Sequence, residues 1–355
     1  MRSTSRLRAR GATGAGVLLA LSLLVLVAVG AGLAGWRWLG MQMDRPGPAA
    51  TALRVQVAAG SRLRGVLTHL QRQGALRGAL AIEVFLRLQG RLPRIQAGLY
   101  EITPHESARQ IVTALVEGRV LLSSITIVEG WRFADMRAAL DADPDVQHGT
   151  RGLSDSELMR QLGHAGEPPE GRFFPDTYRF AAGSSDWRIL QMAYDRMQAT
   201  LQADWAHRAA DLPLATSAQA LTLASIIEKE TARVDERPKI AAVFVNRLRM
   251  GMRLQSDPTV IYGLGESYDG RIHTHDLTSD TPYNTYTRAG LPPTPIALPG
   301  AAALQAAMHP APIDALYFVA SGLPDGSHRF SATLEEHDIA VRAYLRRLGV
   351  TTQKP

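Results

Sequence analysis

A stretch without any charged residue, from Gly11 to Trp36, constrains the organisation of this 355-residue chain more than any other feature. A helix needs about 20 apolar residues to cross a bilayer, and this stretch supplies them. Four arginines precede it and only Arg37 follows directly, so the positive-inside rule places the N-terminus in the cytoplasm. We therefore expect a cytoplasmic segment at residues 1–15 and a single-pass transmembrane helix at 16–36 of an inner membrane, with the remainder periplasmic or otherwise extracytoplasmic.

A cleaved signal peptide is the alternative interpretation of this segment. Small residues that a signal peptidase accepts are present at Ala28, Ala31 and Ala34. However, the apolar run exceeds the core of about 7 to 15 residues that a usual signal peptide has. Trp36 and Trp38 also stand where interfacial aromatic residues belong. These observations favour an uncleaved membrane anchor.

Beyond the apolar stretch, residues 37–50 are rich in proline and glycine toward their end and are typical of a linker. Residues 51–120 then alternate between strand and helix patterns. The patterns predict, in order, a strand at 53–57, helices at 63–73 and 76–89, a strand at 97–102, and a helix at 108–117 capped by Ser107. This outline describes a small α+β module, and its content resembles the LysM-like module of cell-wall proteins.

Composition excludes several classes of function. The chain contains no cysteine, which rules out disulfides, thiolate catalysis and cysteine-ligated metal sites. The net charge of +6 is spread along the chain, so it predicts no nucleic-acid partner. His273 and His275 alternate in a polar segment that is typical of an exposed loop. We expect neither a metal nor a cofactor.

The segment 121–350 is predicted to form a larger mixed α+β domain, so that the whole chain belongs to the α+β class. Its first element, Leu121 to Val128, is apolar and β-branched and predicts a buried strand. An aromatic-dense segment at 170–180 either packs into a core or stacks against sugar rings. Helical patterns at 186–205 and 334–348 and a hairpin pattern at 315–330 complete the domain.

Two acids interrupt an apolar helical run near the middle of this domain. We expect a helix at 218–234, capped by Ser217, in which Glu228 and Glu230 follow a run of apolar residues. Burying an ionised carboxylate without a partner is expensive. Each glutamate must therefore be turned to solvent, paired, or held protonated for chemistry.

Helical periodicity separates the two acids without burying either with certainty. At 100° per residue, Glu228 shares a stripe with Ala224 and Ser225, whereas Glu230 falls near Leu223 and Ile226. The small neighbours of Glu228 leave room for a substrate. The bulkier neighbours of Glu230 indicate packing or an ion pair.

The chain downstream is the part richest in possible ligands for a polar polymer. Residues 252–263 are predicted to be extended and turn structure, and a loop over 281–296 contains several prolines that restrict its conformations. Structural turns alone would also explain these prolines. Amide and phenol groups on rigid loops can bind hydroxyl and N-acetyl groups. The candidate substrate-binding residues are Ser225, Gln255, Asp257, Tyr283, Asn284 and Tyr286.

The order and spacing of these blocks resemble the endolytic murein transglycosylase family, also called the YceG-like family. The resemblance extends from the apolar N-terminal stretch to Phe330. The blocks that carry it are Ala224–Thr231, Val245–Leu248, Gly251–Gly263, Tyr283–Tyr286, Gly290–Pro293, Pro299-Gly300 and His309-Pro310.

The resemblance implies a single-pass inner-membrane protein with a LysM-like module and a domain that cleaves nascent peptidoglycan glycan strands internally. It also implies association with peptidoglycan synthases and the rest of the wall-building machinery. The family's catalytic glutamate is expected at the first acid of the Glu-Lys-Glu-Thr block, which is Glu228 here.

The implied chemistry needs few residues. Cleavage between N-acetylmuramic acid and N-acetylglucosamine requires a proton on the leaving oxygen, and a carboxylic acid with a raised pKa can deliver it. A lytic transglycosylase then uses the C6 hydroxyl of the muramic acid and closes a 1,6-anhydro ring. We expect Glu228 to act as acid and base, while the six candidate substrate-binding residues orient the sugar.

Two other functions fit the sequence. One is a membrane-tethered glycan-binding scaffold that cuts nothing, for which Glu228 would be dispensable. The other is a muramidase that uses water, with a second carboxylate supplied by Glu230, Asp257 or Glu170.

Overall fold

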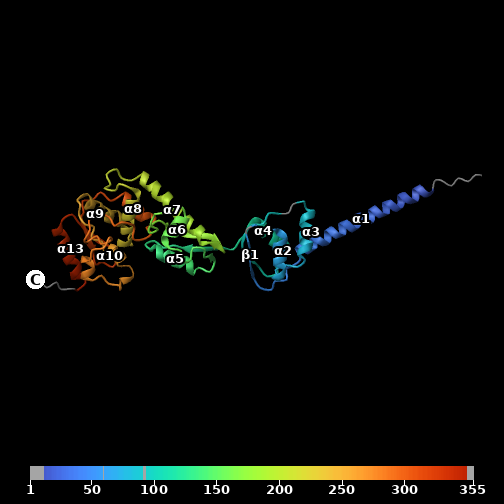
Figure 1. Cartoon of the computed structure of the whole chain (residues 1–355), viewed down its shortest axis with the longest axis horizontal. Coiled ribbons are helices and arrows are strands. Elements are labelled where there is room, and N and C mark those ends of the chain that lie inside the picture. Colours follow the sequence, from blue (N-terminus) through green and yellow to red (C-terminus); the bar gives the residue numbers. More distant parts are fainter. Residues whose placement is uncertain (1–11, 59, 91–92, 350–355) are drawn as a thin grey trace, which may run out of the picture. The chain divides into compact units, whose positions relative to one another are not determined.

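The computed structural model describes residues 12–58, 60–90 and 93–349 (Figure 1). Its helices and short two-stranded sheets confirm the predicted mixed α+β class. The chain separates into two compact units. The first runs up to Leu122 and includes Ala181–Gly183, and the second contains the other residues from Ser123 onward.

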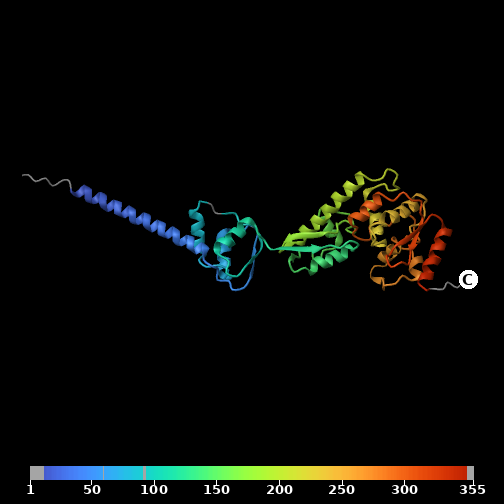
Figure 2. The same cartoon turned by 180° about the vertical axis from the view of Figure 1, so that it is seen from behind.

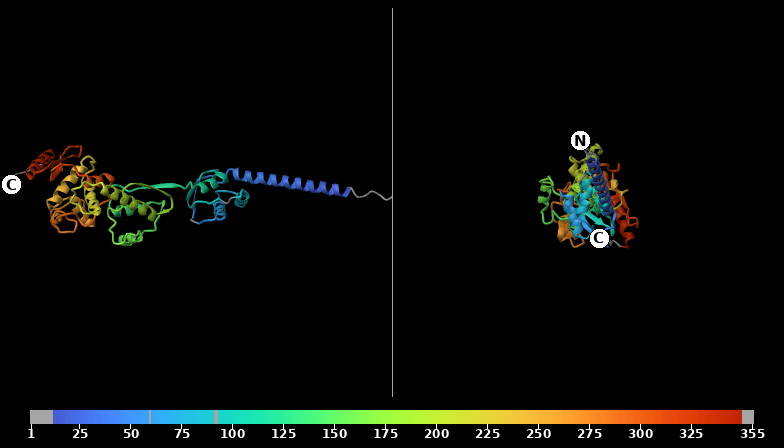
Figure 3. Two further views of the ribbon diagram at one scale, coloured as in Figure 1. Left: turned by 90° about the horizontal axis from the view of Figure 1, so that it is seen from above. Right: turned by 90° about the vertical axis from the view of Figure 1, so that its right-hand side faces the viewer.

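The first unit begins with α1 (Ala12–Asp44), a continuous helix that is visible along its length in Figure 3. By length and composition α1 is able to cross a membrane, and its large apolar side chains from Val17 to Leu33 are exposed. The predicted linker at 37–50 is wrong over its first half, because the helix continues through Asp44. The cause is Met43, which is 2% exposed in the core of the module that follows.

The module contains the predicted elements in the predicted order. An antiparallel pair, β1 (Leu53–Val57) and β2 (Gly98–Ile102), is registered with Leu53 opposite Ile102. Helices α2 (Leu63–Arg72), α3 (Ala79–Leu88) and α4 (Ala108–Glu117) enclose its apolar core. Ser107 caps α4 as expected, in a reciprocal capping box with Gln110. The likeness of this module to LysM-like modules stays a prediction.

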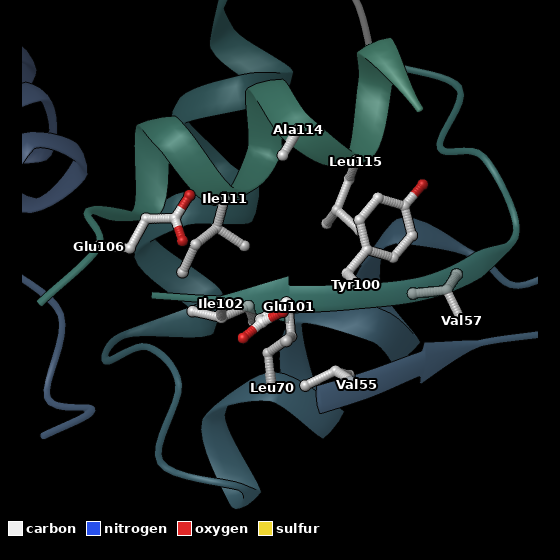
Figure 4. Close-up of a pocket in the computed structure, with 10 residues that line it drawn as sticks. All are labelled: Val55, Val57, Leu70, Tyr100, Glu101, Ile102, Glu106, Ile111, Ala114 and Leu115. Carbon is white, nitrogen blue, oxygen red and sulfur yellow. The ribbon is translucent and has the colours of Figure 1, made fainter. Parts of the chain in front are cut away.

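The core of the module is closely filled. Figure 4 shows a cavity in this core. The side chains that line it include Leu70, Tyr100 and Leu115. This cavity measures only about 10 Å³. A single water needs about 10–15 Å³, so the cavity is a small packing gap and has no room for a sugar.

The second unit starts with small sheets and three helices. Strand β3 (Leu122–Thr126) pairs with β5 (Thr177–Ala181), and β4 (Val146–Gln147) pairs in parallel with β6 (Ser184–Ser185). The predicted buried strand at 121–128 is therefore shorter than expected, and Leu122 and Val128 at its ends are exposed. The helices are α5 (Phe133–Ala142), α6 (Asp155–Gln161) and α7 (Asp186–Ala206). Phe173, Tyr178 and Phe180 are buried among these elements, so this aromatic segment packs into a core.

The centre of the second unit is α8 (Ser217–Glu230), which packs against α7, α9 (Arg237–Arg249) and α12 (Ala301–Met308). Every residue from Ala220 to Ile227 is buried. The predicted boundaries of this helix differ from the structure at both ends. Thr216 replaces Ser217 as the cap, and the helix stops at Glu230 because Thr231 is extended.

The segment after α9 is more helical than the sequence indicated. Instead of turns, α10 (Asp257–Leu264) occupies much of 252–263, with proline in its first turn. It is followed by η1 (Gly265–Ser267) and α11 (Thr274–Thr278). The C-terminal hairpin and closing helix are confirmed as β7 (Tyr317–Ala320), β8 (His328–Ser331) and α13 (Leu334–Arg347).

Gly171 generates a stability prediction, because it has a left-handed backbone with φ of 78° and lies against the proline-rich loop. A Cβ at this position would overlap the Pro295 ring. Gly152 has a similar φ of 81° and nothing near its missing Cβ, so it is a matched control. We expect Gly152→Ala to lose only the backbone term of about 1–2 kcal/mol. Gly171→Ala should lose about 1–3 kcal/mol more from the overlap.

Urea unfolding of the full chain in detergent, followed by circular dichroism, measures both losses. Equal losses for the two variants would show that the loop yields freely to a methyl group at residue 171.

Candidate active site

The last turn of α8 directs its two acids toward different neighbours. On one side, Glu228 accepts a hydrogen bond of 2.6 Å at Oε1 from Nη2 of Arg237. Its Oε2 accepts a second bond of 2.9 Å from the backbone N–H of Gly300, the residue that precedes α12. The side chains of Glu228 and Arg237 are each only 5% exposed. Glu228 therefore joins α8 to the start of α9 and to the start of α12.

Glu129 is a second acid at the same arginine. Its Oε2 lies 3.7 Å from Nη2 of Arg237, and its side chain is half exposed. Its carboxylate packs so closely on Gly300 that any Cβ there would overlap it. The adjacent Gly130 carbonyl accepts a 3.1 Å bond from Nζ of Lys229. We refer to Glu129, Glu228, Arg237 and Gly300 as the arginine network.

The arginine network favours the ionised form of Glu228. Burial raises the pKa of Glu228, while the Gly300 amide and the Arg237 guanidinium oppose that rise. Because an arginine stays charged, protonating Glu228 would leave a buried guanidinium with only Glu129 as a distant counterion. Two other nitrogens of Arg237, Nε and Nη1, already have no hydrogen-bond partner among the described residues. The donors of the network thus offset part of the rise that burial and the charge of Glu129 cause in the pKa of Glu228.

Glu230 has a different environment on the other side of α8. Its Oε1 accepts a short hydrogen bond from the Ser256 hydroxyl. Burial raises the pKa of Glu230 to about 7. The hydrogen bond from Ser256 is the next largest effect and lowers the pKa, while the nearby charge of Asp257 adds a smaller rise and Arg247 a smaller opposing effect. The unpaired carbonyls at the end of a helix also disfavour a negative charge there. Glu230 can therefore hold a proton near neutral pH, and part of its surface remains exposed.

Three of the predicted substrate-binding residues gather around Glu230. Asp257, at the start of α10, accepts a hydrogen bond of 2.5 Å from the Tyr286 hydroxyl. Gln255 and Ser256 both bond to Thr285, through its carbonyl and its hydroxyl respectively. Gln255 is exposed and has a φ of 52°, a conformation that residues other than glycine adopt rarely and mostly where function requires it.

Two other predicted contacts lie inside the protein. Ser225 is fully buried, donates to the Thr222 carbonyl and accepts from the Ile296 amide. Asn284 is 1% exposed, and its amide group bonds to three carbonyls of the preceding turn and to the Tyr286 amide. In this structure neither side chain is open to a sugar, and both hold the surrounding loops in place.

The remaining predicted residue, Tyr283, lines a cavity of about 360 Å³. Its hydroxyl shares a 2.8 Å hydrogen bond with Thr294, and its ring lies 4.8 Å from that of Tyr262. Glu170 lines the same cavity, accepts bonds from the Phe133 amide and the Tyr262 hydroxyl, and has a pKa raised by burial to about 7. Since Asp257 and Tyr262 both belong to α10, this cavity lies about 8 Å along the helix axis from the Glu230 cluster.

A larger groove of about 560 Å³ lies on the other side of Thr294. The proline-rich loop from Gly290 to Pro295 forms one wall, and Gln219, Thr222 and Arg172 contribute polar groups. The two hollows share Pro168 and Thr294 in their linings. Neither lining includes Glu228 or Glu230.

Several residues of the site were not predicted from the sequence. Arg237 and Glu129 lie in segments without a distinctive pattern, although an acid directly after an apolar strand, such as Glu129, is a recurrent place for functional residues. Arg132, whose guanidinium lies 5.2 Å from the centre of the Tyr262 ring, also escaped notice. These residues become significant only through contacts between segments far apart in the sequence.

Comparison with known proteins gives consistent results. The model of the YceG-like family matches residues 55–343. A Bacillus subtilis protein named endolytic murein transglycosylase is 29% identical over 312 residues, covering 83% of this chain and 85% of the relative. A Streptococcus pneumoniae protein of the same name is 26% identical over 319 residues, covering 80% of this chain and 57% of the relative. The crystal structure of a YceG-like protein from Listeria monocytogenes has a TM-score of 0.50 and 29% identity, covering 81% of this chain and 98% of that one.

The raised pKa of Glu230 predicts how stability depends on pH. Folding raises this pKa from an ordinary 4.5 to about 7, so between these values the folded chain binds more protons than the unfolded chain. Stability must therefore fall as pH rises from about 5 to 7, by about 1–3 kcal/mol for this group. Glu170 contributes a fall in the same direction.

Urea unfolding at a series of pH values tests this prediction. Glu230→Gln should flatten the pH dependence, and the double variant with Glu170→Gln should flatten it further. An unchanged slope in Glu230→Gln would mean that Glu230 is ionised across this range.

Proposed function

The chain belongs to the YceG-like family, and on that premise we propose that it is an endolytic murein transglycosylase whose proton donor is Glu230. Two relatives that each align with at least 80% of the chain carry that name. Its substrate is then the glycan strand of peptidoglycan, cut between N-acetylmuramic acid and N-acetylglucosamine within the strand.

The observation that carries the assignment is the contrast between the two acids of α8. Glu230 has a raised pKa of about 7, and Gln255, Asp257 and Tyr286 cluster around it. Glu228, which the sequence favoured, is tied to a buried arginine and a backbone amide. A general acid must carry a proton at the operating pH, and the pKa of about 7 supports Glu230 in that role.

One carboxyl group is enough for the proposed reaction, because it acts first as the acid and then as the base. Glu230 gives its proton to the glycosidic oxygen as the bond from that oxygen to C1 of the muramic acid breaks. The C6 hydroxyl of the same sugar bonds to C1, and its proton passes to the Glu230 carboxylate. The products are a 1,6-anhydro end and a free hydroxyl on the leaving sugar, and Glu230 is again protonated for the next cycle.

The neighbours of Glu230 have distinct roles in this proposal. Asp257 keeps the pKa of Glu230 high, and its negative charge stabilises the oxocarbenium-like transition state. Tyr286 fixes the Asp257 carboxylate through its hydroxyl. The exposed amide of Gln255 binds the sugar. Ser225 and Asn284 position the loops and do not touch the substrate.

The cavity beside Tyr283 is the place for a further sugar of the strand. Tyr262 and Tyr283 offer aromatic rings, while Glu170 and Arg132 offer charged groups. A site for a further sugar suits an enzyme that cuts within strands.

We propose that the N-terminal part holds this activity at the membrane. We assign α1 as a single-pass anchor with its N-terminus in the cytoplasm, which leaves both folded units on the periplasmic or extracytoplasmic side. The first unit is then a LysM-like glycan-binding module. Such an anchor holds the enzyme near newly made strands and near the synthases that produce them.

Product analysis with matched variants tests the reaction and the assignment together. Full-length protein in detergent is incubated with purified glycan strands, and the new ends are identified by mass spectrometry. We expect 1,6-anhydro ends from the wild type and a loss of about 100-fold or more in Glu230→Gln, because the proton donor is gone. Glu228→Gln should retain measurable cleavage but unfold at lower urea concentration, since it disrupts the arginine network.

Other outcomes select the rival functions. Reducing ends indicate a muramidase that uses water, and no cleavage by any variant indicates a scaffold. Loss of cleavage in a folded Glu228→Gln protein, with activity retained in Glu230→Gln, would return the catalytic role to Glu228.

The rate should depend on pH through Glu230. Activity should fall as pH rises through about 7, because the acid must be protonated. Asp257→Asn removes the neighbouring charge that raises this pKa, so the alkaline limb should move to lower pH. Measured kcat at a series of pH values checks the shift, with Asp314→Asn as a control on an exposed acid outside the Glu230 cluster and outside both hollows. If the alkaline limb of the pH–rate profile does not move in Asp257→Asn, the charge of Asp257 does not control the pKa of Glu230.

A further inference from the structure

Helix α3 presents an apolar stripe that nothing in its own unit covers. Leu80, Val84 and Leu88 are 68%, 39% and 61% exposed. Their spacing of four residues places them on one face of the helix. The opposite face is occupied by Ile82, which is fully buried, and by its neighbours in the module core. The stripe is therefore surplus to the packing of the module.

The stripe lies beside the end of the apolar helix α1. The rings of Trp36 and Phe85 are 5.1 Å apart, and Phe85 belongs to α3. Figures 1 and 2 show α3 at the end of the module where α1 enters. Tryptophan at the end of a membrane span lies at headgroup depth. Since Trp36 touches α3, the same depth applies to α3.

The chain around α3 is strongly basic. Between residues 45 and 90 the only acid is Glu83, against the arginines Arg45, Arg54, Arg62, Arg64, Arg72, Arg77 and Arg87. Glu83 is itself neutralised, because it forms ion pairs with Arg87 at 2.7 Å and Arg64 at 3.6 Å. A surface of this charge is attracted to anionic lipid headgroups.

We infer that α3 is an interfacial helix, which inserts Leu80, Val84 and Leu88 into the outer boundary of the bilayer while the surrounding arginines contact anionic phospholipid headgroups. An apolar face flanked by arginines is the usual composition of a helix that lies in the membrane surface. The inference rests on the proposed role of α1 as a membrane span. It adds that the first unit contacts the lipid surface through α3 as well as being attached to the membrane by α1.

Single cysteines with an environment-sensitive dye test this placement without background, because the chain has no cysteine of its own. Val84→Cys reports on the stripe. Leu24→Cys, within α1, reports on the span. Gln56→Cys is the exposed control on β1, which Figures 1 and 2 show away from the point where α1 enters. Each full-length protein is reconstituted into phosphatidylcholine vesicles, with or without phosphatidylglycerol, that contain lipids brominated on their acyl chains.

We expect quenching at Val84 several-fold stronger than at Gln56, stronger still with phosphatidylglycerol, and weakened by salt. Adding Leu80→Ser and Leu88→Ser to the Val84→Cys protein should reduce the quenching, and exposed positions tolerate these changes without unfolding. Quenching at Leu24 with none at Val84 would overturn the interfacial helix and leave the anchor intact. No quenching at Leu24 would overturn the anchor and this inference together. Absence of quenching in the labelled Val84→Cys protein, together with a disulfide-linked dimer of the same variant left unlabelled, would show that a second copy covers the stripe, which also overturns the inference.

Discussion

The burial of α8 is the constraint on which the candidate site depends. From Ala220 to Ile227 every residue of this helix is inside the second unit, in contact with α7, α9 and α12. The helix ends only at Glu230, so both of its acids leave the core in the last turn, where helix carbonyls disfavour negative charge. Each carboxyl group must be stabilised by whatever lies on its own side. The chemistry of the site follows from what those two sides contain.

A step of two residues along a helix is a rotation of about 200° around its axis, so Glu228 and Glu230 contact different segments of the chain. On one side a buried guanidinium and a backbone amide provide two donors, which is a setting for an anion. On the other side a single hydroxyl faces a carboxyl that has another acid nearby, which is a setting for a shared or retained proton. One helix thus places its two acids in contrasting environments, and such contrasts separate the roles of paired carboxyl groups in glycosidases.

The sequence predicted the module and the α+β class well because these depend on local patterns. Strand alternation at 53–57 and the Ser107 cap are readable in a few consecutive residues, and the structure places both as expected. The helix wheel also separated Glu228 from Glu230 correctly in direction. The wheel does not indicate what each acid faces: beside Ser225, where small side chains predict room for a substrate, the structure has the Ile296 backbone. The partner Arg237 lies beyond the break after Thr231, where no periodic pattern extends.

The arginine network has a consequence for Glu230 that its own contacts do not provide. Glu228 is bonded to the residue that precedes α12 and to the first residue of α9, so the final turn of α8 cannot rotate without breaking a buried ion pair. Breaking such a pair leaves a charge unpaired in the interior and costs about 3–5 kcal/mol. That penalty holds Glu230 beneath the Ser256 hydroxyl and beside Asp257, in the one environment that raises its pKa to about 7. In the proposed mechanism Glu228 is therefore a positioning residue, and the two acids of the Glu-Lys-Glu-Thr block depend on each other although they face apart.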